Sequence, residues 1–140
     1  MRGKGLPSQI EWTVRGRALV TDVPITYLGY VNRDTGIIEE SGHPLDGEQI
    51  KDTILVYPKG SGSTVAPFVL MGLTYTGMGP KAVINRDVCP LSLPACSLLD
   101  IPYGHNFDAD PCIELNSGDY VELNLSGGII NLTMLERAGR

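Results

Sequence analysis

Residues 10–20 read IEWTVRGRALV, and apolar side chains alternate along this stretch with polar or charged ones. A period of two over so many residues is typical of a long strand with one buried face. Gly16 falls on the apolar face, where a missing side chain favours a bulge or a bend. The stretch therefore predicts a β-rich fold and locates its first long strand.

Shorter patterns extend the prediction outward from this strand. The run Thr53–Tyr57 is apolar and β-branched, and Ser63 or Thr64 could cap a helix with Pro67 in its first turn. Near the C-terminus, two alternating stretches flank Ser126-Gly127-Gly128, a hairpin signature. The further strands expected are 53–57, 82–85, 121–125 and 130–134, and the helices are about 65–73 and one within 88–99.

Between Thr21 and Asp52 the periodicity is lost and turn sequences dominate. Short strands are expected at 25–31 and 36–39. A connection of this length is usually functional or paired with something else. We therefore expect a single β-rich α/β domain over residues 1–140, with one or two helices.

Composition narrows the function classes. The chain has 140 residues with a formal net charge of −5, which argues against nucleic-acid binding. No apolar run reaches the roughly 18 residues that a membrane span needs, and no secretory signal is visible. Three cysteines without a close pair do not suit a disulfide framework. We expect buried free thiols and a cytoplasmic location.

The chemistry concentrates in residues 57–65, YPKGSGSTV, where a strand runs into a glycine loop and then a helix. Backbone N–H groups in such an arrangement point at one place and favour an anion, or a serine whose deprotonated form they stabilise. The loop is not a nucleotide P-loop, because Lys59 precedes both glycines. It contains no Gly-x-Ser-x-Gly elbow either. The alternative is a solvent-exposed turn with an N-cap.

Histidine and cysteine positions do not suggest a metal site. His43 and His105 have no partner at helical metal-site spacing, so structural or surface roles are expected for both. Cys89, Cys96 and Cys112 are too widely spaced for a typical iron–sulfur run. We predict that this chain alone holds no metal.

Several segments, taken together, resemble a known family. They are residues 14–20 (VRGRALV), 35–38 (TGII), 43–47 (HPLDG), 59–64 (KGSGST) and 66–70 (APFVL). Their order and spacing are similar to those of small subunits in the aconitase X group, phosphomevalonate dehydratase in particular. The resemblance implies a swivelling β/β/α domain, a barrel that corresponds to the mobile fourth domain of aconitase.

The resemblance also implies an activity. Members of this family are expected to dehydrate (R)-5-phosphomevalonate to trans-anhydromevalonate 5-phosphate, in the archaeal-type mevalonate route to isoprenoids. The partner is a large catalytic subunit, in a heterodimer, and that subunit is expected to hold the [4Fe-4S] cluster. The alternatives are the small component of another aconitase X dehydratase, such as the cis-3-hydroxyproline enzyme, and a non-catalytic anion-binding or assembly module.

The loop is similar to the aconitase pattern Gly-x-Gly-Ser-Ser-Arg-Glu-His, whose first serine is the catalytic base. By that resemblance, Ser63 is the proton acceptor. The expected substrate-binding residues are Lys59, Gly60, Ser61, Gly62 and Thr64. One position departs from the pattern, since Val65 stands where aconitase has the arginine that holds a substrate carboxylate.

Overall fold

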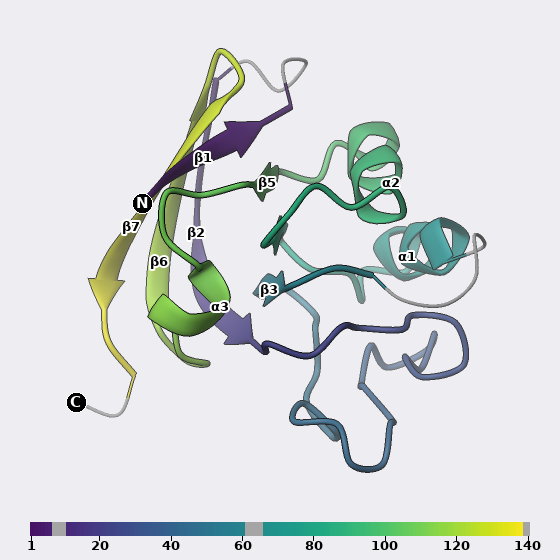
Figure 1. Cartoon of the computed structure of the whole chain (residues 1–140). Coiled ribbons are helices and arrows are strands. Elements are labelled where there is room, and N and C mark those ends of the chain that lie inside the picture. Colours follow the sequence, from purple (N-terminus) through teal and green to yellow (C-terminus); the bar gives the residue numbers. More distant parts are fainter. Residues whose placement is uncertain (7–10, 61–65, 139–140) are drawn as a thin grey trace.

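The structure is a computed structural model that describes residues 1–6, 11–60 and 66–138. Strands and helices alternate through the middle of the chain, and strands occupy both ends (Figure 1). The strands are β1 (Arg2–Gly5), β2 (Glu11–Val20), β3 (Ile54–Tyr57), β4 (Ala82–Asn85), β5 (Tyr103–His105), β6 (Tyr120–Ser126) and β7 (Ile129–Glu136). The helices are α1 (Ala66–Tyr75), α2 (Ser92–Leu99) and α3 (Pro111–Glu114).

The strands form a closed barrel in the order β1-β5-β4-β3-β2-β6-β7. Its two halves differ in direction. Strands β2, β3, β4 and β5 run parallel to one another. The pairs β2–β6, β6–β7, β7–β1 and β1–β5 are antiparallel. Helices α1 and α2 lie together on the side of the parallel half (Figure 1). The barrel and its helices agree with the fold that the family resemblance implied.

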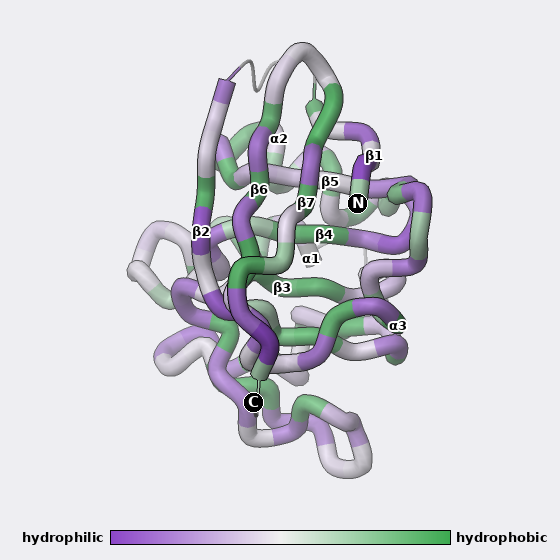
Figure 2. Tube along the Cα trace, turned by 90° about the vertical axis from the view of Figure 1, so that its left-hand side faces the viewer, coloured by the Kyte–Doolittle hydropathy of each residue, from purple (hydrophilic) through white to green (hydrophobic). Residues whose placement is uncertain are grey.

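Two apolar cores share the parallel strands. In β3, Leu55 and Tyr57 belong to the core that includes α1 and α2, whereas Ile54 and Val56 belong to the core that includes β6 and β7. Both faces of these strands are thus covered, which explains their continuous apolar sequence. Figure 2 shows β3 and β4 as largely hydrophobic strands, while the hairpin β6–β7 alternates in hydropathy along its length.

The long first strand is confirmed, with two corrections. It runs from Glu11 to Val20 and pairs with β6 from Glu11–Ser126 to Arg17–Tyr120. Gly16 lies within this regular ladder opposite Val121, so the expected bulge at Gly16 is wrong. The absent side chain instead lets Ile54 pack closely, since an added Cβ would lie 3.3 Å from its Cγ1. Trp12, predicted to face the core, is 38% exposed.

The segment 21–52 pairs more sparsely than predicted. Instead of strands at 25–31 and 36–39 it makes isolated bridges, Ile25 with Gly60, Val31 with Ile38 and Ile37 with Gln49. Six of its apolar side chains are nevertheless buried in the core that includes α1 and α2: Ile25, Tyr27, Val31, Ile38, Leu45 and Ile50. The segment is therefore a structural cover for that core and contacts the start of the glycine loop.

Three short elements are additions to the predicted set. Strands β1 and β5 and helix α3 have four, three and four residues, too few for a periodic pattern. In α3, Asp110 accepts a hydrogen bond from the backbone N–H of Cys112 and acts as the N-cap. The helices are thus three in the described chain, against one or two expected. None of them is long and apolar enough to cross a membrane.

Candidate functional site

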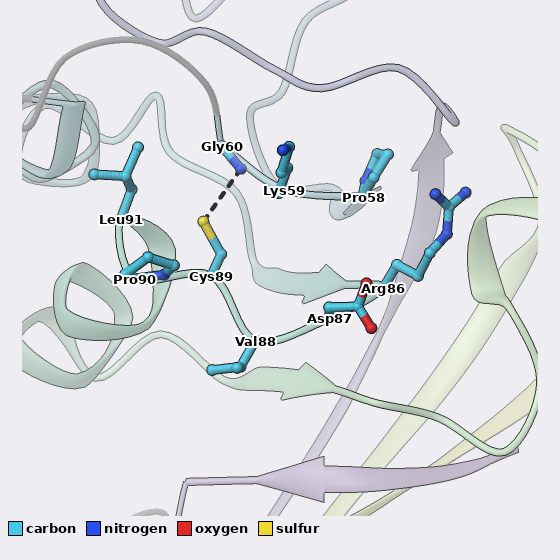
Figure 3. Close-up of a pocket in the computed structure, with 9 residues that line it drawn as sticks. All are labelled: Pro58, Lys59, Gly60, Arg86, Asp87, Val88, Cys89, Pro90 and Leu91. Carbon is cyan, nitrogen blue, oxygen red and sulfur yellow. Dashed lines mark hydrogen bonds between the residues drawn. The ribbon is translucent and has the colours of Figure 1, made fainter.

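A pocket lies at the carboxyl ends of β3 and β4, beside the start of the glycine loop (Figure 3). One wall is the segment 58–60, which follows β3, and the other is the segment 86–91, which connects β4 to α2. The volume is about 510 Å³, which falls within the usual range for small-molecule sites. Because β3 and β4 are parallel, their following loops meet at one edge, the usual place for ligands in parallel sheets.

The pocket carries two cations and one acid: Lys59, Arg86 and Asp87. Arg86 Nε lies 2.7 Å from Asp110 Oδ2 as an ion pair, although the Nε–H is not aimed well enough to make a hydrogen bond. In Figure 3 the Arg86 guanidinium points away from Cys89. Because Asp110 already pairs with Arg86, Lys59 is the pocket cation that a bound anion would contact.

Cys89 links the two walls of the pocket. Its Sγ accepts a hydrogen bond of 3.2 Å from the backbone N–H of Gly60, drawn in Figure 3. Burial, the largest single influence, raises the pKa of this thiol. Donation from the Ser92 hydroxyl and from the N–H groups of Gly60, Ser92 and Leu91 outweighs it, so the pKa lies below its ordinary value. The start of α2 thus stabilises negative charge on this sulfur.

Of the predicted site residues, the structure places two at this pocket. Lys59 and Gly60 both line it, and their backbones are held by Ile25, whose N–H donates to Lys59 O at 3.3 Å. The other four predicted site residues, Ser61, Gly62, Ser63 and Thr64, lie outside the described residues. The proton-acceptor role of Ser63 stays a prediction.

Both histidines make local contacts. His43 is buried; its Nδ1 accepts from the N–H of Leu45, so the ring proton is on Nε2, which donates to Pro24 O at 3.1 Å. His105 Nδ1 lies 2.7 Å from Asn106 Oδ1. His43 therefore has the structural role that the sequence predicted.

The three cysteines are buried and form no disulfide, as predicted. Cys96 lies in α2 and Cys89 just before it, whereas Cys112 lies in α3 and belongs to the other core. In the described part of the chain, no three His, Cys, Asp or Glu side chains come together as a metal ion would require. These residues do not fit an iron–sulfur cluster.

Sequence reasoning missed the whole second wall, residues 86–91. Arg86 and Cys89 follow a strand that was predicted, and the available signal was topological. The loops after neighbouring parallel strands share an edge, so residues after β4 meet residues after β3. The one-dimensional pattern alone did not say that these two strands are neighbours.

Comparison with known proteins gives a consistent family. Residues 7–132 match the aconitase X swivel domain family. The chain is 38% identical over 117 residues to the phosphomevalonate dehydratase small subunit of Methanosarcina acetivorans, covering 84% of this chain and 81% of that protein. It is 33% identical over 132 residues to the one from Pyrococcus horikoshii, covering 94% of each.

The fold agrees with the sequence comparison. A chain in the crystal structure of Thermococcus kodakaraensis aconitase X, in its holo-form, superposes with a TM-score of 0.81 at 27% identity, over 95% of this chain and 98% of that one. A UPF0107 protein solved by solution NMR gives a TM-score of 0.78 at 30% identity, over 95% and 99%. By sequence and by fold, the chain belongs to the aconitase X swivel domain family.

Proposed function

We propose that this chain is the small subunit of a hydro-lyase that dehydrates (R)-5-phosphomevalonate to trans-anhydromevalonate 5-phosphate. The proposal is supported by its relatives, which bear the name phosphomevalonate dehydratase small subunit and match 84% to 94% of the chain. The observation that carries it is the pocket at the carboxyl ends of β3 and β4, which Lys59 and Gly60 line at the start of the glycine loop. This is where a substrate would meet that loop.

The reaction requires removal of a carbon-bound proton. Phosphomevalonate has a tertiary hydroxyl β to a carboxylate, and elimination removes a proton from the carbon between them while the hydroxyl leaves as water. A serine is a poor base unless preorganised donors stabilise its alkoxide. Ser63, between Gly60 and the start of α1 at Ala66, is proposed to accept this proton. Backbone N–H groups at the start of that helix are suitable donors.

Recognition of the two anionic groups of the substrate falls in part to this pocket. Val65 replaces the aconitase arginine, so another cation must take its place. Lys59 and Arg86 are the two cationic side chains that line the pocket. We propose that Lys59 binds a phosphate or carboxylate oxygen, with the backbone of Gly60, Ser61, Gly62 and Thr64 completing the contact.

The remaining chemistry belongs to the partner. A small subunit implies a larger one, and we propose an aconitase X-type large subunit that forms a heterodimer with this chain in the cytoplasm and carries the [4Fe-4S] cluster. The contribution proposed for this chain is proton removal and anion binding.

The test is co-expression of this chain with its large subunit, followed by an assay of phosphomevalonate for loss of water. We expect turnover by the complex and none by either chain alone. If the complex forms but acts only on cis-3-hydroxyproline, the proposed substrate is wrong and cis-3-hydroxyproline takes its place. If the chain does not associate with the large subunit but binds phosphate by itself, it is an anion-binding module and the proposal is wrong.

A further inference from the structure

A chain of hydrogen bonds lies under the pocket and ends on the glycine loop. The Tyr27 and Tyr57 hydroxyls are 2.7 Å apart, and the Tyr57 hydroxyl is 3.0 Å from Ser92 Oγ. The Ser92 hydroxyl in turn bonds to Cys89 Sγ, which accepts the N–H of Gly60. The loop is thus connected to side chains deep in the core.

A second branch fixes the backbone of the same cysteine. The N–H of Cys89 donates to the Tyr103 hydroxyl at 3.2 Å, and that hydroxyl donates to Asn85 Oδ1 at 2.7 Å. Asn85 Nδ2 donates to Tyr57 O at 3.1 Å, closing the network back onto the end of β3. Hydrogen bonds therefore fix both the backbone and the side chain of Cys89.

The network is almost entirely withdrawn from solvent. Exposure is 0% for Tyr57, Asn85 and Tyr103 and 2% for Ser92 and Cys89. Apolar residues of similar shape can replace a satisfied buried network with little loss of stability, so stability alone does not require these groups. Satisfied buried networks, however, restrict a core to one arrangement. Here the group they fix is the first residue of the glycine loop.

Gly60 is thus held from both sides: it bridges to Ile25 on one side and donates to Cys89 on the other. An added Cβ on Gly60 would lie at an ordinary van der Waals distance, 3.5 Å, from Cys89 Sγ, so the sulfur lies beside this glycine. We infer that Cys89 is a positioning residue, whose sulfur sets the place from which the glycine loop leaves β3. The inference rests on the proposed function, since it concerns the loop that carries the proposed base.

The test compares Cys89→Ala, which removes the acceptor, with Cys89→Ser, which keeps one. In the complex with the large subunit, we expect Cys89→Ala to lower kcat for phosphomevalonate by about tenfold or more, because a displacement near 1 Å can cost up to about 100-fold. KM should change much less. Cys89→Ser should recover most of kcat, and Tyr57→Phe, which breaks the chain one step further away, should lose less than Cys89→Ala.

Cys112→Ala is the matched control, because it removes a buried thiol from the other core. Its kcat should equal that of the unmodified complex. The inference is overturned if Cys89→Ala behaves like this control, or if Cys89→Ser is as impaired as Cys89→Ala.

A second readout separates this inference from the proposed function. Amide hydrogen exchange of Gly60, followed by NMR on the full chain, should be faster in Cys89→Ala than in Cys89→Ser or Cys112→Ala. If the complex has no activity on phosphomevalonate yet Gly60 exchange responds in this way, the proposed substrate is wrong and the positioning role stands. Equal Gly60 exchange in all three variants overturns the positioning role whatever the substrate.

Discussion

The two halves of the barrel bury their side chains in different ways. All four residues of β3 and all four of β4 are buried, whereas β6 and β7 alternate between buried and more exposed positions. Helices α1 and α2 account for the difference, because they cover the outer face of the parallel strands. The loops of the covered half meet at one edge and form the pocket, while the antiparallel half closes the barrel. Function and stability should therefore separate along this division.

The largest expected effect falls on the loop of the parallel half. If Ser63 takes the proton, Ser63→Ala should lower kcat of the complex by about 10²–10⁴-fold, the usual range for general acid–base catalysis, while substrate still binds. Loss of an N-cap could add about 1 kcal/mol of destabilisation. Ser61→Ala is the control and should cost far less. Steady-state kinetics decide, with cluster content measured alongside, and a larger loss for Ser61→Ala would mean that the base is misassigned.

Substitutions in the antiparallel half should lower the stability of the chain and leave the activity of the complex unchanged. Leu123 in β6 is 0% exposed, so Leu123→Ala should lower the free energy of unfolding by about 2–5 kcal/mol, the range for a buried leucine. The kcat of the complex that still assembles should be unchanged. Leu135→Ala, at a position in β7 that is 46% exposed, is the matched control and should cost much less. Urea unfolding followed by circular dichroism gives both values; equal losses would contradict the burial pattern.

How far the sequence predicts each element depends on the length of that element and not on the half of the barrel in which it lies. The alternating β2, β6 and β7, the apolar β3 and β4 and the two longer helices were all predicted, because each is long or distinctive enough to carry a pattern. Strands β1 and β5 were not, since RGKG and YGH contain glycines and only three or four residues. Their strand state depends on pairing with distant neighbours.

The sequence predicted one wall of the candidate site and missed the other. Lys59 and Gly60 follow a recognisable strand and were expected at the site. Arg86 and Cys89 belong to it only through the adjacency of β3 and β4, a property of the folded sheet. Spatial partners of this kind have no local signature in the chain.

A smaller effect, on KM, should distinguish Lys59 at the pocket from Lys4 in the antiparallel half. Lys59→Met should raise KM for phosphomevalonate by about tenfold, since a charge-assisted hydrogen bond is worth about 1.5–3 kcal/mol and part of it is lost to solvent screening. Lys4→Met, in β1 and away from the pocket, is the control and should leave KM unchanged. A KM for Lys59→Met equal to that of the control would remove Lys59 from the proposed anion site.

The smallest effect is a pH dependence of opposite sign at two cysteines. Cys89 has a pKa below its ordinary value when folded, so its contribution to stability is present above the ordinary thiol pKa of about 8.5 and is lost as pH falls through the folded pKa. Burial raises the pKa of Cys112 to about 12, so its contribution is present below the ordinary value and is lost as pH rises toward 12.

Urea unfolding at several pH values measures both effects. The stability difference between the unmodified chain and Cys89→Ser should grow as pH rises toward about 8.5, and that for Cys112→Ser should shrink above it. Parallel curves for the two variants would contradict the lowered pKa of Cys89.

The closure of the barrel has a consequence for the order of folding. The hydrogen bond between Thr13 and Asn124 joins strands 111 positions apart in the chain, and β1 likewise finds both neighbours in later segments. The units β3–α1–β4 and β4–α2–β5 connect close neighbours instead. Since distant pairings form slowly, we expect the βα units to form early. The N-terminal strands β1 and β2 should pair only after the β6–β7 hairpin has formed. In stopped-flow refolding, Leu55→Ala should then slow folding more than Val14→Ala in the N-terminal strand β2, relative to the stability that each variant loses.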